Sequence, residues 1–264
     1  MEGLFAGGAE REGDSMKSNR GTWPAALTIL AFFLAWEIAA RMVNMLFILP
    51  PPTGILSKLW ELREPLFIEH LPITLVIILI GLTISILLGA GMAVWMSVSP
   101  AAEKVIYPLI ISSQMIPIIA LAPIFVLWFG YSIWSKVVVT VLITFFPITV
   151  NTYDGLQSAS KELKELMMTM GAGKKEIFTK LVVPSALPHF YSGLKVAVTL
   201  SVIGAAIGEW LGAQAGLGYF SRRMMTQFDG AAVFAPIVLL SAIGIVLFVI
   251  VKFIEQKSLK WRKS

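Results

Sequence analysis

Three long stretches without a charged side chain dominate this sequence. No Asp, Glu, Lys or Arg occurs in residues 71–102, 105–135 or 230–251. The hydrocarbon core of a bilayer is about 30 Å thick, so a helix that rises about 1.5 Å per residue needs roughly 20 apolar residues to cross it. Each stretch meets this length, and the chain is therefore predicted to cross a membrane several times.

The composition supports a single membrane domain of the all-α class. Only 14% of the residues are charged, whereas a soluble domain carries about 25%, and no polar stretch is long enough to fold separately. Six spans are predicted, at about residues 23–43, 71–96, 105–130, 136–153, 194–211 and 233–253.

The third predicted span contains three prolines. Pro108, Pro117 and Pro123 interrupt its apolar run, and proline lacks the backbone N–H that a helix interior requires. The expected structure is a kinked helix followed by an interfacial or re-entrant piece, because irregular backbone in a membrane must be shielded by protein.

Basic residues near the span ends predict the orientation. Residues 1–22 mix acidic and basic side chains, which is not the pattern of a cleavable signal peptide, and they are expected to form a disordered cytoplasmic tail ahead of the membrane domain of residues 23–264. With this tail inside, 15 of the 21 Lys and Arg residues face the cytoplasm. This excess places both termini there. The other six basic residues are Arg41, Lys58, Arg63, Lys136, Arg222 and Arg223.

The longest cytoplasmic connection, residues 154–193, is polar and rich in helix formers. It is interrupted at residues 171–173, which read Gly-Ala-Gly, and again at Pro184 and Pro188. This pattern predicts two short helices separated by a glycine turn. Such a segment is too structured for a passive linker and lies where a cytoplasmic partner can reach it.

A motif in this connection resembles the cytoplasmic loop motif of binding-protein-dependent ABC importer permeases. The family pattern is a Glu, two Ala, three variable residues and a Gly, then nine residues followed by Ile, any residue, Leu and Pro. Glu165, Gly171 and Pro184 match at this spacing, and Leu181 and Val183 are conservative apolar replacements. A glycine turn that arises by chance between two loop helices is the alternative.

The motif departs from the family at the two alanines, which are Leu166 and Met167 here. Both replacements are helix formers. A carboxylate on a short helix can pair with a basic residue of a docked protein, and a glycine permits a turn that other residues resist. The resemblance assigns ATPase coupling to Glu165, Gly171, Leu181 and Pro184.

The resemblance covers the chain from about Trp36 to the C-terminus. Within the family it is closest to the branch that serves nitrate, sulfonates, taurine and the pyrimidine precursors of thiamine. The last two segments quoted below look most like the thiamine-pyrimidine members. The segments that carry the resemblance are residues 49–52, 117–123, 128–130, 208–213 and 216–219.

This resemblance implies a permease subunit of the small type I importer fold, located in a bacterial inner membrane and surrounded by lipid. By this resemblance, two permease copies are expected to form the path, two copies of a separate ATPase to supply the energy, and an extracytoplasmic binding protein to deliver the solute. The expected solute is a hydroxymethyl- or formylamino-pyrimidine, with sulfonate, taurine or nitrate as alternatives. The mechanism it implies is alternating access. The chain itself is not expected to be an enzyme or to bind nucleic acid.

No catalytic, cofactor or metal site is expected. The sequence Gly-Ala-Gly-Lys at residues 171–174 is not a phosphate loop, since that pattern needs Gly at Met168 and Ser or Thr at Lys175. An ion-coupled secondary transporter is the rival of another class, but it would show internal repeats and several buried ionisable groups. A membrane-embedded enzyme would need a His or carboxylate cluster.

Two predicted spans carry small residues at every fourth position. Such rows let helix backbones approach closely, and close packing is the first interpretation. Lining of the translocation path or of a dimer seam is the second, and it is more plausible for the fifth span. The rows are Gly81, Ser85 and Gly89 in the second span, and Gly204, Gly208 and Gly212 in the fifth.

Two acidic residues lie inside predicted spans. A charge there must face protein or water. Glu209, near the outer end of the fifth span, has two open interpretations: a role at the mouth of the path, or a structural partner of Arg222 or Arg223. Glu37 is expected to be structural, because Arg41 follows four residues later in the order that favours a helical ion pair.

Overall fold

The computed structural model describes residues 22–260, and all regular secondary structure in this part of the chain is helical. The predicted tail lies outside the described residues except for Thr22, with which the first helix begins. The elements are α2 (Thr22–Val43), α3 (Pro52–Glu61), η1 (Pro65–His70), α4 (Leu71–Val98), α5 (Pro100–Ser113), α6 (Ile118–Phe129), α7 (Ile133–Gln157), α8 (Lys161–Thr169), α9 (Lys174–Ile177), η2 (Phe178–Val182), α10 (Val183–Gly212), α11 (Leu217–Thr226) and α12 (Gly230–Ser258).

Five helical segments within residues 22–260 are long and apolar enough to cross a membrane. The predicted third span is a bent pair, in which α5 and α6 meet at 98°. The predicted break is confirmed, and it lies at Pro117, which precedes the first residue of α6, while Pro108 and Pro123 lie inside helices. Counting the bent pair as one span gives six. The five continuous segments are Ala26–Val43, Pro65–Val98, Ile133–Gln157, Lys174–Gly212 and Gly230–Ser258.

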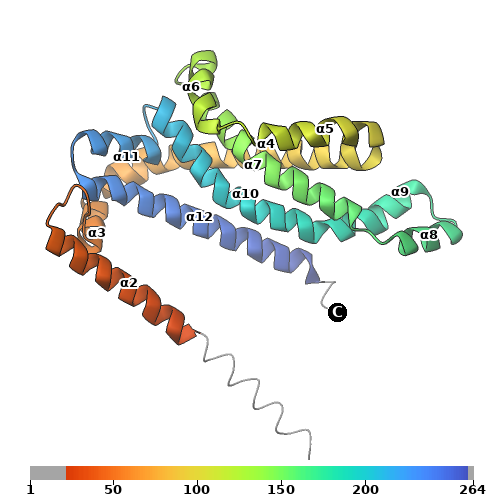
Figure 1. The fold of residues 1–264 in the computed structure, drawn as a ribbon, viewed down its shortest axis with the longest axis horizontal. Coiled ribbons are helices and arrows are strands. Elements are labelled where there is room, and N and C mark those ends of the chain that lie inside the picture. Colours follow the sequence, from red (N-terminus) through yellow and green to blue (C-terminus); the bar gives the residue numbers. More distant parts are fainter. Residues whose placement is uncertain (1–21, 261–264) are drawn as a thin grey trace, which may run out of the picture.

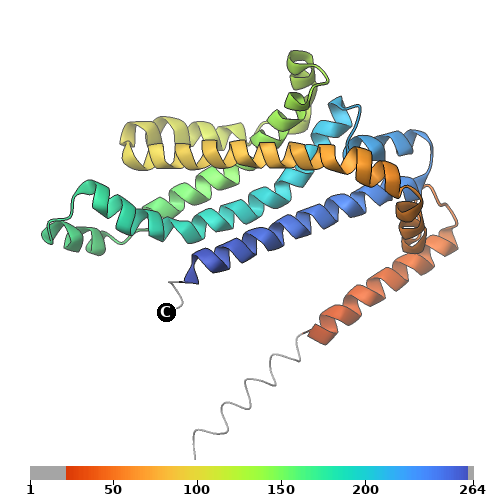
Figure 2. The same ribbon diagram turned by 180° about the vertical axis from the view of Figure 1, so that it is seen from behind.

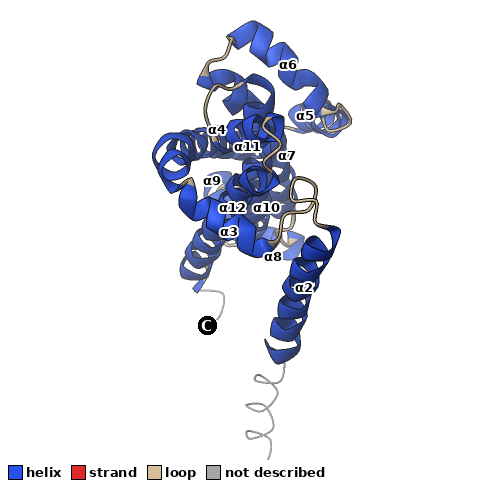
Figure 3. Cartoon of the chain, turned by 90° about the vertical axis from the view of Figure 1, so that its left-hand side faces the viewer, coloured by secondary structure: helices blue, strands red, loops and turns tan. Residues whose placement is uncertain are grey.

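The long helices α4, α7, α10 and α12 run along the long axis of the molecule (Figure 1). The short helices α8 and α9 lie at one end of this bundle, and α3 and α11 lie at the other, as the reverse view also shows (Figure 2). Helices α2 and α6 lie at the periphery when the molecule is viewed from its end (Figure 3). The two ends of the bundle therefore carry different small helices.

Helix α7 lies between α4 and α10, and small residues allow the close contact on both sides. A methyl group placed on Gly81 of α4 would lie 2.6 Å from the Thr140 Cγ2, and one placed on Gly204 of α10 would lie 2.9 Å from the Thr140 Cα. The hydroxyls of Ser85 and Thr144 are 2.6 Å apart between α4 and α7. The rows on α4 and α10 thus both approach α7, and Gly81 and Gly204 contact the same residue of it, Thr140.

Helices α9, η2 and α10 follow one another without a break from Lys174 to Gly212. The predicted interruption at Pro184 and Pro188 is therefore wrong. The π-helical turn η2 directly precedes Pro184, which lies in the first turn of α10, and local π geometry lets a helix continue past proline. The second short helix of the predicted cytoplasmic connection is thus continuous with the fifth span.

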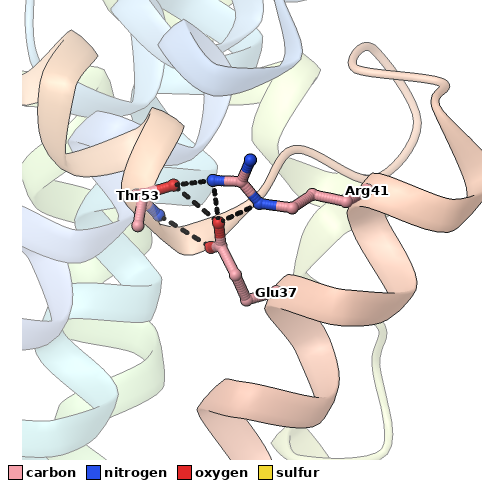
Figure 4. A network of polar contacts seen from close by, with 3 residues as sticks. All are labelled: Glu37, Arg41 and Thr53. Atoms are coloured by element: carbon pink, nitrogen blue, oxygen red, sulfur yellow. Dashed lines mark hydrogen bonds and ion pairs between the residues drawn. The ribbon is translucent and has the colours of Figure 1, made fainter.

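Helix α2 diverges from the bundle, and only 6% of the spanning part is buried (Figure 1). Its C-terminal end is joined to α3 by a polar network (Figure 4). The Arg41 Nη2 lies 2.6 Å from the Glu37 Oε1, which confirms the predicted pair. Thr53 donates to the same carboxylate through its Oγ1 at 2.8 Å and its backbone N–H at 3.1 Å. Glu37 therefore also satisfies a free N–H in the first turn of α3.

Candidate functional site

The turn between α8 and α9, predicted to be cytoplasmic, follows a helix with a capped N-terminus. Ser160 precedes α8, and its Oγ accepts a hydrogen bond from the Leu163 N–H at 3.3 Å. Glu162 lies in the first turn, where a negative charge stabilises the helix N-terminus. The Ser160 hydroxyl also lowers the pKa of Glu162 by donating to its carboxylate. These contacts define where α8 begins.

Helix α8 ends in a two-hydrogen-bond glycine cap, the Schellman motif. The Gly171 N–H donates to the Met168 carbonyl at 3.0 Å, and the Ala172 N–H donates to the Met167 carbonyl at 2.9 Å. Gly171 has a φ of 85°, in the left-handed region where a side chain is disfavoured. The predicted glycine turn between two short helices is confirmed, and Gly171 is the residue that requires glycine.

Helix α8 exposes an apolar face as well as a carboxylate. Leu163, Leu166 and Met170 are 48%, 54% and 78% exposed, and their spacing places them on one side of the helix. Glu165 is also exposed. It makes no side-chain hydrogen bond or ion pair with the part of the chain that the structure describes. An exposed apolar face beside an unpaired charge is typical of a protein-docking surface.

The other two predicted coupling residues lie on the bundle side of the turn. Leu181 in η2 packs against the buried cluster that contains Val182 and Tyr153. Pro184 is half-buried at the start of α10. Glu165 and Gly171 therefore shape the exposed part of the turn, whereas Leu181 and Pro184 lie where it joins the spans. Sequence reasoning missed the apolar face of α8, although its spacing at positions i, i+3 and i+7 was readable.

The glycines of the fifth span lie against other helices of the same chain. A methyl group placed on Gly208 would lie 2.9 Å from the Lys136 Cα in α7, and one on Gly212 would collide with Val126 in α6. With Gly204 against Thr140, the whole row faces inward. This geometry favours the packing interpretation over a lining of the path.

A leucine at Gly208 is expected to separate α10 from α7 and to reduce both the amount of folded protein and transport. Overpacking of a tight core costs typically about 1–3 kcal/mol, and here the obstacle is backbone. Gly91 offers the matched control, because no atom would lie within 4 Å of a methyl group placed there. Membrane abundance and thermal unfolding of Gly208→Leu and Gly91→Leu measure the difference. Equal stability of the two variants would contradict the close-packing interpretation.

Glu209 is fully buried in the last turn of α10. Its carboxylate accepts hydrogen bonds from the Thr74 hydroxyl at 2.7 Å and from the Gly218 N–H at 2.7 Å. Within residues 22–260 it forms no ion pair with Arg222 or Arg223, and Arg222 instead donates to the Trp210 carbonyl. The arginine pairing proposed from the sequence is therefore not the one that the structure has.

The candidate spans, the glycine rows packed between helices and the glycine-capped turn between α8 and α9 are the features expected of a membrane-spanning permease component. Residues 81–260 match the family model described as "Binding-protein-dependent transport system inner membrane component". The chain belongs to this family of ABC importer permeases.

Curated relatives cover nearly the whole chain. The formylaminopyrimidine transport permease protein of Halalkalibacterium halodurans is 56% identical over 249 residues, which are 94% of this chain and 100% of that protein. The riboflavin transport system permease protein of Chloroflexus aurantiacus is 30% identical over 250 residues, 93% of each chain. The taurine transport system permease protein of Escherichia coli is 26% identical over 247 residues, 91% of this chain and 85% of that protein.

Solved structures share the fold. The inward-facing methionine ABC transporter matches with a TM-score of 0.61 and 19% identity, over 74% of this chain and 95% of that one. An amino acid ABC transporter structure obtained with histidines matches with a TM-score of 0.56 and 20% identity, over 76% and 95%. The expected all-α importer permease fold is confirmed.

Proposed function

We propose that this permease imports a thiamine pyrimidine precursor of the formylaminopyrimidine type. The observation that carries the proposal is the 56% identity to the Halalkalibacterium halodurans permease along its entire length. Relatives that carry other solute names are less similar: those named for riboflavin, aliphatic sulfonates and taurine are 30%, 29% and 26% identical. Taurine remains the second candidate, with other sulfonates and nitrate as further outcomes of the same test.

Uptake by the reconstituted importer tests the solute. Labelled formylaminopyrimidine is expected to accumulate in proteoliposomes only with ATP and the cognate binding protein, and to continue when ionophores dissipate ion gradients. Unlabelled taurine or nitrate in excess is expected not to compete. Uptake that follows the ion gradient and needs no ATP would support a secondary transporter instead.

The proposed assembly is a permease homodimer with two ATPase subunits and one extracytoplasmic binding protein. Helix α8 supports the position of the ATPase, because it joins an exposed carboxylate, Glu165, to an apolar face that the described part of the chain leaves uncovered. ATP binding would close the ATPase dimer and displace the α8–α9 turn. The spans would then alternate between inward-open and outward-open states, which the ATPase and the binding protein stabilise unequally.

Single cysteines test the proposed orientation, since the chain has no cysteine of its own. Cysteines at Thr169 in α8 and Gln256 in α12 are expected to react with a membrane-impermeant maleimide only from the cytoplasm. A cysteine at Gln227, directly after α11, is expected to react only from outside. All three side chains are exposed. Reaction of Thr169→Cys with the maleimide in intact cells would contradict the proposed orientation and the proposed docking of the ATPase to α8.

A further inference from the structure

The turn that leads from α10 into α11 is built around three acceptor side chains. Three successive backbone N–H groups point into the protein, and each donates to a different buried residue. The acceptors come from η1, α4 and α10, so three elements meet at one turn. The hydrogen bonds are Gly216 N to His70 Nδ1 at 3.1 Å, Leu217 N to Thr74 Oγ1 at 2.9 Å, and Gly218 N to Glu209 Oε2 at 2.7 Å.

Thr74 and Glu209 are joined to each other as well as to the turn. The Thr74 hydroxyl donates to the Glu209 Oε1 at 2.7 Å, and both residues are fully buried. Both carboxylate oxygens thus have a donor, and the N-terminus of α11 adds a favourable dipole. These contacts offset the cost of burying the charge. A buried carboxylate whose two oxygens both accept hydrogen bonds is not available to a passing solute. This disfavours a role of Glu209 at the mouth of the path.

Two glycines show that the turn is shaped around this carboxylate. Gly216 has a φ of 115°, and a methyl group placed there would collide with the Glu209 carboxylate. A methyl group on Gly218 would lie 3.0 Å from the Glu209 Oε2 and 2.8 Å from the Ala206 carbonyl. Only a chain without side chains at these two positions can approach Glu209 closely enough to form the observed hydrogen bonds.

Glu209 also lies at one end of a long helical segment. The segment from Lys174 to Gly212 has 39 residues, which corresponds to a length of about 58 Å. It begins at the cytoplasmic turn after Gly171 and reaches the opposite end of the bundle, beside α11 (Figure 1). Because a packed helix moves as a body, a displacement at its cytoplasmic end is carried to Glu209.

We propose that Glu209 is a positioning residue for transport. With Thr74 it fastens α11 to the outer end of α10, so that the displacement given to the α8–α9 turn reaches the extracytoplasmic surface. Helix α11 is suited to this role because it buries Leu217 and Phe220 and exposes Arg223 and Met225 on its other side. The proposal rests on the coupling function proposed for α8.

The matched substitutions Thr74→Val and Thr74→Ser test this link. Valine keeps the size of threonine but leaves the Glu209 Oε1 and the Leu217 N–H without their partner, whereas serine keeps the hydroxyl. Thr74→Val is expected to retain ATP hydrolysis and to transport about tenfold less solute per ATP hydrolysed. Thr74→Ser is expected to stay close to the parent protein in both measurements.

Spin labels measure whether this link holds α11 at a fixed distance from α10, and transport per ATP hydrolysed measures whether the link couples movement to transport. Ile203 on α10 and Met225 on α11 are 52% and 42% exposed, and labels there report the α10–α11 distance. The parent is expected to keep one narrow distance distribution with and without ATP, and Thr74→Val is expected to broaden it. A narrow distribution and parental transport per ATP in Thr74→Val would overturn the proposal.

Two substitutions of Glu209 separate the effect of side-chain length from the effect of charge. Glu209→Gln keeps the length of the side chain and one of its two acceptor oxygens, while Glu209→Asp keeps the charge and both oxygens but is one methylene shorter. If Glu209 must reach both donors to hold α11, Glu209→Gln is expected to transport more solute per ATP hydrolysed than Glu209→Asp. Better transport per ATP in Glu209→Asp than in Glu209→Gln would overturn the proposal. If Thr74→Val fails to assemble, Glu209→Asp takes its place as the deciding variant. A parent complex that takes up no solute would contradict the proposed function instead.

Discussion

The Gly171→Val permease is expected to reach the membrane at the parental level and to lose about tenfold or more of its ATP-driven uptake. Gly171 has a φ of 85°. A β-branched residue is a strong outlier in this region, and the strain costs on the order of 1–3 kcal/mol. No atom would lie within 4 Å of a methyl group at this position, so the defect comes from the backbone. The turn is expected to open and to misplace α8.

Gly173, two residues later, is the matched control. It also has open space around it, but its φ of −75° and ψ of 164° are extended values that valine adopts readily. Gly173→Val should therefore retain ATPase association and uptake. Gly171→Asn should be intermediate, since asparagine tolerates the left-handed region. Purified complexes in proteoliposomes allow subunit retention, ATP hydrolysis and uptake to be measured together. Equal behaviour of Gly171→Val and Gly173→Val would show that the turn geometry does not matter for coupling.

Glu165→Lys is expected to weaken the association with the ATPase by about 30-fold, which corresponds to about 2 kcal/mol. Glu165 is exposed, and its carboxylate is unpaired within residues 22–260. Reversal of the charge at this position would replace the attraction between Glu165 and a basic residue of the docked ATPase with repulsion. Because the residue lies outside the spans, insertion and abundance should not change.

Glu165→Gln controls for shape and hydrogen bonding, and its effect should be smaller than that of Glu165→Lys. Titration of the purified permease with its ATPase at two salt concentrations measures both affinities. The difference between parent and Glu165→Gln should shrink at high salt, because screening weakens a surface charge pair. Unchanged affinity and uptake in Glu165→Lys would show that α8 is only a connector.

The parts of the fold that depend on local sequence were predictable. Uncharged runs located three of the spans, and three prolines predicted the break in the third predicted span, although only Pro117 lies at it. The motif around Glu165 and Gly171 predicted two short helices and a glycine turn, because a helix cap is decided by a few neighbouring residues. The Glu37–Arg41 pair is equally local, with both residues on one face of a helix.

The parts that depend on distant residues were not predictable in the same way. Thr74 and Glu209 are 135 positions apart, and no local pattern connects a threonine in one span with a carboxylate in another. Nearby arginines were the obvious partners in the sequence, yet the donors to the carboxylate are the Thr74 hydroxyl and the Gly218 backbone N–H. Pro184 was misleading because residue propensities do not predict the π-helical turn that directly precedes it and lets the helix continue.

The polar network at the end of α2 has a consequence for biogenesis. Synthesis proceeds from the N-terminus, so α2 leaves the ribosome before the bundle from which it diverges exists. A lone Glu37 would then be costly at the membrane border. Arg41 compensates the charge as soon as the last turn of α2 forms, because the two residues are one helical turn apart. Thr53 follows 16 residues after Glu37, and its arrival docks α3 onto a carboxylate already held in place. The contacts of this network can therefore form one after another as the chain is synthesised, first the Glu37–Arg41 pair and then the hydrogen bonds from Thr53.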